Sequence, residues 1–231
     1  MQTLKFVAAA LAAVGLSRVS SAMTLTIYKV ADTPWQSSDA TLGLSGANII
    51  DFESTALPSG VTVSVNAPAG SYAPTSTLPF LFDPVVNDPN PAQVLTPGIW
   101  DGTRVFVNRL DANVPLGYVD SPLTKWGSFT FGFPAGTTLV GFSVGQMDAA
   151  QTLSVNGNNL RVLDASNFPG SGNRHGYLVI TAGVGETIST VSLTSNFGDG
   201  YSIDHLAYAV PEPTSLALLS LTSLLLKRRR D

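Results

Sequence analysis

Strict alternation of apolar and small or polar residues in two neighbouring runs constrains the fold of this chain more than any other feature. The apolar members are Phe129, Phe131 and Phe133 in the first run and Val140, Phe142 and Val144 in the second. A period of two places every second side chain on one face of a β-strand. A turn signal, Pro134-Ala135-Gly136, separates the runs. The pattern predicts a β-hairpin with one buried face.

Further short strands are predicted along most of the chain, separated by Gly, Pro and Asn turns. The candidates span residues 25–30, 48–53, 61–65, 103–108, 153–155, 160–163, 177–181, 188–194 and 201–208. No window outside the two terminal segments has the apolar stripe of a packed helix. About eleven short strands with such turns indicate an all-β fold. We expect an antiparallel β-sandwich, jelly-roll-like in its connections.

Proline is concentrated in one internal segment, residues 66–101. Seven prolines fall there: Pro68, Pro74, Pro79, Pro84, Pro89, Pro91 and Pro97. Each removes an amide donor from a strand ladder, so the segment cannot form a central strand. We interpret it as a surface loop or edge excursion of the 23–210 domain. Long loops of this kind are often functional, and a disordered decoration is the alternative.

The charge balance and the absence of cysteine exclude several classes of function. Residues 23–210 contain 6 Lys and Arg against 14 Asp and Glu, a net charge of −8. No basic patch is available to neutralise phosphates, so a nucleic-acid partner is not expected. A chain without cysteine has no disulfides, thiol catalysis or thiolate metal site. The composition, rich in Gly, Ser, Thr, Asn and Val, is typical of an extracellular β-protein.

The N-terminus has the three parts of a secretory signal peptide. Lys5 supplies the positive region, residues 6–16 form an apolar stretch, and Ser20-Ser21-Ala22 places small residues at the −3 and −1 positions. We expect residues 1–22 to form the signal helix, the Sec machinery to export the chain, and signal peptidase to cut after Ala22. The remaining body, residues 23–210, has the size of one β domain.

The C-terminus combines a helix breaker, an apolar run and a basic stop. Pro211-Glu212-Pro213 is followed by the apolar segment 214–226 and by Lys and Arg at 227–230. As a helix the 13-residue segment spans roughly 20 Å, less than the ~30 Å hydrocarbon core, so it is a marginal transmembrane helix. The basic residues would stay on the cytoplasmic side and leave the body outside. A C-terminal helix packed on the domain is the alternative.

Those residues resemble the PEP-CTERM sorting signal, also labelled the ice-binding protein C-terminal motif, of bacterial exported proteins. The resemblance implies that Pro211, Glu212 and Pro213 are recognised and cut by an exosortase, a membrane protease. It also implies that residues 214–230 are discarded. The body resembles the sandwich domains that precede this signal. The resemblance lies in Ile49-Ile50-Asp51-Phe52-Glu53, in Phe129-Thr130-Phe131 followed by Val140-Gly141-Phe142, and in Gly200-Tyr201-Ser202-Ile203-Asp204-His205-Leu206. That likeness implies a fold related to carbohydrate-binding jelly rolls.

Asp51 and Glu53 are the leading candidates for chemistry. Two residues apart on a predicted strand, they would project from one face about 6.6 Å apart. Such carboxylates could serve glycoside hydrolysis or bind Ca²⁺, and an ordinary solvated strand face is the alternative. Related jelly rolls often hold a structural calcium between first and last strands, which by resemblance would add Asp204. His205, next along, is expected on the opposite face, packed or hydrogen-bonded.

Trp100 is the candidate for binding a glycan. Aromatic rings stack on the apolar faces of sugars, and Trp100 has the polar neighbour Asp101 at the exit of the proline-rich segment. Core packing is the alternative for the tryptophans. No nucleophile motif, zinc motif or phosphate loop is present.

We therefore expect a non-enzymatic exported protein, anchored at first by its C-terminal segment. After processing it would act at the cell surface or in the extracellular matrix, in adhesion, matrix structure or polysaccharide binding. The alternative is a secreted glycoside-active enzyme that uses Asp51 and Glu53.

Overall fold

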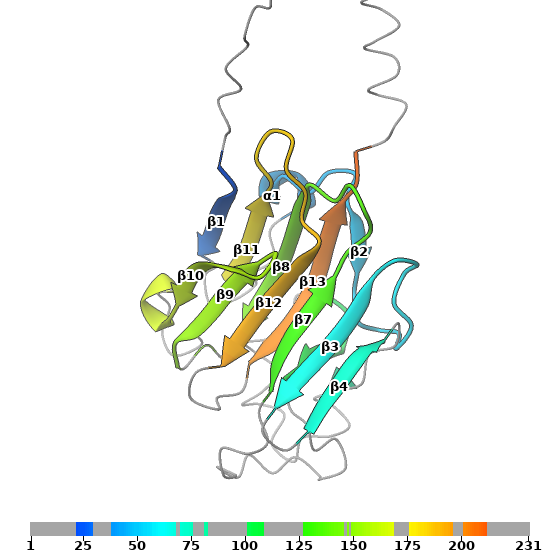
Figure 1. Cartoon of the computed structure of the whole chain (residues 1–231), viewed down its shortest axis with the longest axis vertical. Coiled ribbons are helices and arrows are strands. Elements are labelled where there is room, and N and C mark those ends of the chain that lie inside the picture. Colours follow the sequence, from blue (N-terminus) through cyan, green and yellow to red (C-terminus); the bar gives the residue numbers. More distant parts are fainter. Residues whose placement is uncertain are drawn as a thin grey trace, which may run out of the picture.

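Two antiparallel β-sheets pack face to face in the computed structural model and form a sandwich (Figure 1). The structure describes residues 22–29, 38–67, 70–75, 81–82, 101–108, 127–145, 147, 149–168, 176–195 and 201–211. The all-β sandwich expected from alternation is confirmed.

The first sheet has the order β1-β11-β8-β13-β6-β5, with β2 also paired to β13. Its strands are β1 (Thr24–Lys29), β2 (Asn48–Ile50), β5 (Leu81–Phe82), β6 (Val105–Val107), β8 (Leu139–Gly145), β11 (Gly176–Thr181) and β13 (Ser202–Ala209). β13, the last strand in the described residues, is therefore central and is bonded to β8, β6 and β2.

The second sheet has the order β10-β9-β12-β7-β3-β4. Its strands are β3 (Thr62–Ala67), β4 (Gly70–Thr75), β7 (Ser128–Gly132), β9 (Gln151–Val155), β10 (Asn158–Leu163) and β12 (Thr190–Ser195). The proline-rich segment contributes β4 and β5, each at the end of a sheet. Pro74 lies in β4, where an edge position tolerates a residue without an amide donor.

The predicted hairpin across Pro134 is wrong, because its two strands belong to different sheets. β7 pairs with β3 and β12, whereas β8 pairs with β11 and β13. The connection is a crossover: Phe133 N donates to Ser189 O (2.9 Å), and Thr138 N donates to Ala209 O (2.9 Å). Both strands still turn their apolar face to one core. Alternation reports the buried face and not the strand partner.

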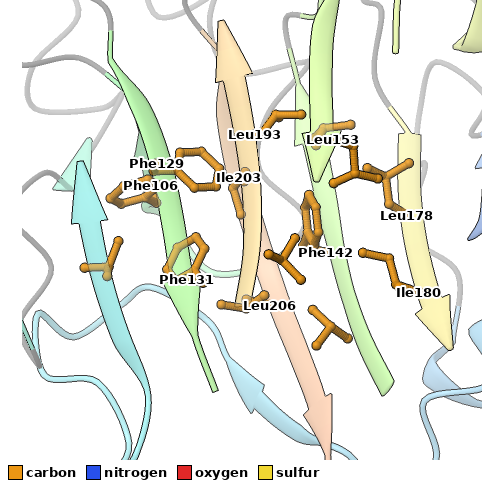
Figure 2. Packing of buried hydrophobic residues seen from close by; sticks show 14 of the residues in the cluster. Phe106, Phe129, Phe131, Phe142, Leu153, Leu178, Ile180, Leu193, Ile203 and Leu206 are labelled. Carbon is orange, nitrogen blue, oxygen red and sulfur yellow. The ribbon is translucent and has the colours of Figure 1, made fainter. Parts of the chain in front are cut away.

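The space between the sheets is filled by one continuous hydrophobic core (Figure 2). Its aromatic centre consists of Phe52, Phe106, Phe129, Phe131 and Tyr201. The rings of Phe106 and Phe129 meet edge to face at 5.1 Å between centroids, and Phe129 meets Tyr201 in the same way at 5.1 Å. Such ring pairs add roughly 0.5–1.5 kcal/mol each beyond the area they bury.

A short helix covers the outer face of the first sheet. α1 (Asp39–Leu42) is capped by Ser38, whose hydroxyl accepts from Thr41 N, and it ends at Gly43 with a φ of 75°. Leu42 and Leu44 pack on Tyr177, Val179 and Ala207 in a second, smaller core cluster. One turn is too short to show a helical stripe, which is why the sequence did not predict it.

The predicted signal helix and the C-terminal segment lie outside the described residues, apart from Ala22 and Pro211, which are both exposed. Within the described part of the chain, no helix has the length and apolarity needed to cross a membrane.

Candidate functional site

A β-bulge in β13 places Asp204 and His205 on the same side of the first sheet. The register shifts between Asp204, opposite Ser143, and Ala207, opposite Gly141, so β13 carries one extra residue there. His205 lies within the bulge and has a φ of 48°. The neighbours Ile203 and Leu206 both belong to the central core. The expectation that His205 lies opposite Asp204 is therefore wrong, because a bulge interrupts the period of two.

Asp204 is fully buried and holds the bulge through its carboxylate. Oδ1 accepts from the N–H of His205 (2.8 Å), and Oδ2 accepts from the N–H of Asp101 (3.1 Å). The hydroxyl of Ser143 donates to the Asp204 carbonyl at 3.0 Å. The carboxylate thus ties the last strand to the loop that precedes β6.

His205 is bound by two further carboxylates from distant parts of the chain. Its Nδ1 meets Asp101 Oδ2, and its Nε2 lies 2.8 Å from Asp39 Oδ1 at the start of α1. The hydroxyl of Tyr177 donates to the His205 carbonyl at 2.8 Å. Burial disfavours the charged imidazole, but the hydrogen bonds and charges of Asp101 and Asp39 outweigh it and raise the pKa of His205. The His205 side chain therefore links α1 and the loop before β6 to β13.

The raised pKa of His205 predicts a stability that declines in mildly alkaline solution. The folded protein holds this proton more tightly than the unfolded chain, so the contribution is complete below the unfolded pKa of about 6.5. It is lost as the pH rises through the higher pKa of the folded state. In urea unfolding between pH 5.5 and 8.5, the wild type should lose stability relative to His205→Asn. Asparagine tolerates the positive φ, and parallel pH profiles would contradict the prediction.

Glu53 clamps the loop between Asp101 and Arg104. Its Oε1 accepts from the N–H groups of Thr103 (2.6 Å) and Arg104 (2.7 Å), and its Oε2 accepts from the Thr103 hydroxyl (3.1 Å). Burial alone would raise the pKa of Glu53, but these bonds and the Arg104 charge lower it. Gly102 has a φ of 61°, and a Cβ there would overlap the Glu53 carboxylate. The close approach requires glycine.

Asp51 and Glu53 do not share a strand face as predicted. β2 ends at Ile50, and Phe52 between the two acids has a φ of 57° with its ring fully buried. Asp51 Oδ1 accepts from the N–H of Glu53 (3.1 Å), a local turn bond. The predicted strand 48–53 is therefore shorter in the structure, because residues 51–53 form this turn.

The sequence-predicted calcium ligands were Asp51, Glu53 and Asp204. Among the residues the structure describes, no group of three or more His, Asp or Glu is arranged to hold a metal ion. Asp204 and Glu53 each use both carboxylate oxygens as acceptors of protein hydrogen bonds. A cation at either carboxylate would have to compete with these bonds. Calcium binding by this set stays a prediction from the sequence.

On the outer face of the second sheet, the described outward residues of β3, β7, β9 and β12 carry hydroxyl or amide groups, apart from Gly132, and none of them is ionisable. One row crosses five strands in register through Ser64, Thr130, Ser192, Ser154 and Asn159. The Thr130 and Ser192 hydroxyls lie 2.8 Å apart, and Ser154 donates to Asn159 at 2.9 Å. The other outward residues of β3, β7, β9 and β12 are Thr62, Asn66, Ser128, Gly132, Thr152, Thr190 and Thr194. We call this surface the hydroxyl face.

Three of the predicted site residues lie outside the described part of the chain. They are Trp100, Glu212 and Pro213. The structure adds Asp39 and Tyr177 around His205, neither of which was assigned to a site from the sequence, and it places Asp101 there too, which was expected only as the polar neighbour of Trp100. The only signal in the sequence was the adjacent pair Asp204-His205, since Asp39 and Asp101 lie 166 and 104 positions from His205.

Comparison with known proteins adds little about the ligand. No family model matches the chain. The search of curated proteins finds no match either. Among solved structures, the chain is similar to TmCBM61 in complex with β-1,4-galactotriose, at 19% identity over 69% of this chain and 94% of that one, with a TM-score of 0.31. At this TM-score, the similarity does not bear on what the present chain binds.

Proposed function

We propose that the chain is an exported, non-enzymatic envelope or matrix protein that an exosortase sorts and whose sandwich binds neutral polysaccharide. The export part rests on the two terminal signals in the sequence. The fold is consistent with both cuts: β1 begins at Thr24, just after Ala22, and β13 ends at Ala209, just before Pro211. Removing both signals would leave every described strand intact. The jelly-roll-like connectivity is part of the same proposal.

The hydroxyl face is the observation that carries the polysaccharide proposal. Ser, Thr and Asn side chains both donate and accept hydrogen bonds, as sugar hydroxyls do. Neighbouring groups on such a face lie about 4.8 Å apart across strands and about 6.7 Å apart along them. An acidic polymer would be repelled by a body of net charge −8. A neutral glycan fits this surface better than a charged one.

A charge placed in the middle of the hydroxyl face tests this assignment. We expect Thr130→Glu to reduce co-sedimentation with insoluble neutral polysaccharides several-fold, because the carboxylate must be desolvated without a partner. Thr181→Glu, at an exposed position on the first sheet, is the matched control and should bind like the wild type. Equal binding of both variants would remove the hydroxyl face from the proposal.

Trp100 supplies a different candidate for the glycan site, in a segment outside the described residues. The same assay on Trp100→Ala separates the two. Loss of binding in this variant with full binding in Thr130→Glu would move the site from the hydroxyl face to Trp100.

The alternative, a glycoside-active enzyme using Asp51 and Glu53, is less well supported by the geometry. A general acid needs a raised pKa, whereas the pKa of Glu53 is lowered and its oxygens hold the 101–104 loop. Release of reducing sugar from several polysaccharides, lost in Glu53→Gln, would revive the enzyme hypothesis. Glu53→Gln should otherwise change stability alone.

Calcium binding stays a proposal from the sequence. A metal that binds only the folded state raises the melting midpoint by mass action. The sharpest measurement compares melting in millimolar Ca²⁺, Mg²⁺ and EDTA. A selective rise with Ca²⁺, absent in Asp204→Asn, would support the site, and superimposed curves would reject it.

Sorting is tested in the export-competent native host. Intact-mass analysis of the mature protein should find neither residues 1–22 nor the basic tail. Replacing Pro211-Glu212-Pro213 by Ala-Ala-Ala should leave the C-terminal segment attached and the protein in the membrane fraction. Normal processing of that variant would contradict the exosortase assignment.

A further inference from the structure

We propose that one end of the sandwich, built from turns 56–60, 133–138, 156–157 and 182–189 with residues 209–211, faces the lipid surface while the precursor is anchored. We call it the membrane-facing end. The inference rests on the proposed function, because it takes the anchor to be the C-terminal segment. It adds an interaction surface that the sorting signal does not by itself specify.

Strand register places both ends of the folded body at this end. Thr24 of β1 is opposite Thr181, Thr181 is opposite Leu139, and Leu139 is opposite Ala209. These four residues form one row across the first sheet, so Thr24 and Ala209 lie three strand spacings apart, about 14 Å. The chain therefore enters and leaves the sandwich at the same end (Figure 1).

Hydrogen bonds from backbone and side-chain amides join turns 133–138, 156–157 and 182–189 of this end into one unit. Ile188 N donates to Thr137 O (2.7 Å), and Ala182 N donates to Thr138 O (2.8 Å). Asn156 reaches across from the β9–β10 turn and donates to Thr187 O at 2.7 Å. Because Thr138 also donates to Ala209 O (2.9 Å), the exit point of the chain is fixed to this unit.

The short connection to the predicted anchor brings this end close to the bilayer. From Ala209 to Thr214, where the apolar segment begins, there are five residue steps, which span at most roughly 17 Å when fully extended. Pro211 and Pro213 in that stretch also limit its conformations. The opposite end of the sandwich is a full strand length further away.

The surface of the membrane-facing end suits a lipid boundary. Val184 is 72% exposed at the tip of its turn and Val210 is 37% exposed, two of the three exposed large hydrophobic side chains in the described residues. Glu186 is the only ionisable side chain in the described turns of this end, and it accepts from Gly183 N at 3.1 Å. An acidic body approaching an anionic bilayer is repelled least when its charge-poor end leads.

The absence of cysteine allows a direct test with single labelled sites. Val184→Cys and the matched control Val162→Cys, 55% exposed on β10, each carry one fluorophore in the full-length protein. Val162 lies about 13 Å further along the strands from the 156–157 turn. The proteins are reconstituted into phosphatidylethanolamine–phosphatidylglycerol vesicles with nitroxide-labelled headgroups. We expect several-fold stronger quenching at position 184 than at position 162.

The outcomes separate this inference from the proposed function. Vesicle flotation of the same samples reports anchoring by the C-terminal segment. Protein that floats but is quenched equally at both sites, or more at position 162, overturns the orientation and leaves the sorting proposal standing. Protein that does not float overturns the anchor itself, and the inference falls with it.

Discussion

Replacing Phe106 by alanine is expected to lower the free energy of unfolding by about 3–5 kcal/mol. Phe106 is fully buried at the centre of the sandwich and contacts the rings of Phe52, Phe129 and Phe131. The truncation loses the free energy gained by burying the ring. It also leaves a cavity between the two sheets, and this cavity cannot close unless β6 moves. Urea unfolding followed by tryptophan fluorescence and circular dichroism measures the loss.

Val162→Ala is the control for that measurement, because Val162 is 55% exposed and does not belong to the hydrophobic core. Its effect should stay within about 0.5 kcal/mol. A loss below about 1 kcal/mol for Phe106→Ala would mean that the core can collapse around the missing ring, contrary to the packing described here.

Replacing Asp204 by alanine is expected to lower the free energy of unfolding by about 3–6 kcal/mol, because two backbone N–H groups, one buried and one partly buried, lose their acceptor, and bonds to a charged acceptor contribute about 1.5–3 kcal/mol each. The stranded donors are the amides of His205 and Asp101. Asp204→Asn keeps the shape and one acceptor oxygen, so it should lose less. Denaturant unfolding at pH 7 gives both values.

Asp51→Ala serves as the matched control for Asp204, since it also removes a carboxylate that accepts a backbone bond, but at an exposed turn. We expect a change within about 0.5 kcal/mol. If Asp204→Ala were no more destabilising than Asp51→Ala, the bulge would be held by the strand ladder alone.

The strands were largely predictable because burial of one face imposes a period of two. In the described part of the proline-rich segment, β4 and β5 each lie at the end of a sheet, where a missing amide donor is tolerated. The partner of each strand was not predictable in the same way. The turn after Phe133 suits a hairpin by sequence, and only the bonds to Ser189 and Ala209 reveal a crossover.

The arrangement around His205 was beyond local sequence reasoning for two physical reasons. A one-residue bulge moves the His205 side chain to the other face of the sheet. No residue type in β13 predicts this bulge. The partners Asp39 and Asp101 come from segments whose positions are set by α1 and by the Glu53 bonds to the 101–104 loop. The failed prediction that Asp51 and Glu53 share a strand face has a similar origin, since β2 already ends at Ile50 and Phe52, between the two acids, has a positive φ.

In the proposed export, the central place of β13 determines when the first sheet can form. β2, β6 and β8 all pair with it, so the first sheet cannot be completed until residue 209 has been delivered. Pairings between such distant segments form slowly, because the loop must close before any contact stabilises it. The chain would thus stay unfolded, and able to pass through a translocation channel, until nearly all of residues 23–210 have crossed. Folding would then finish only a few residues ahead of the predicted membrane segment.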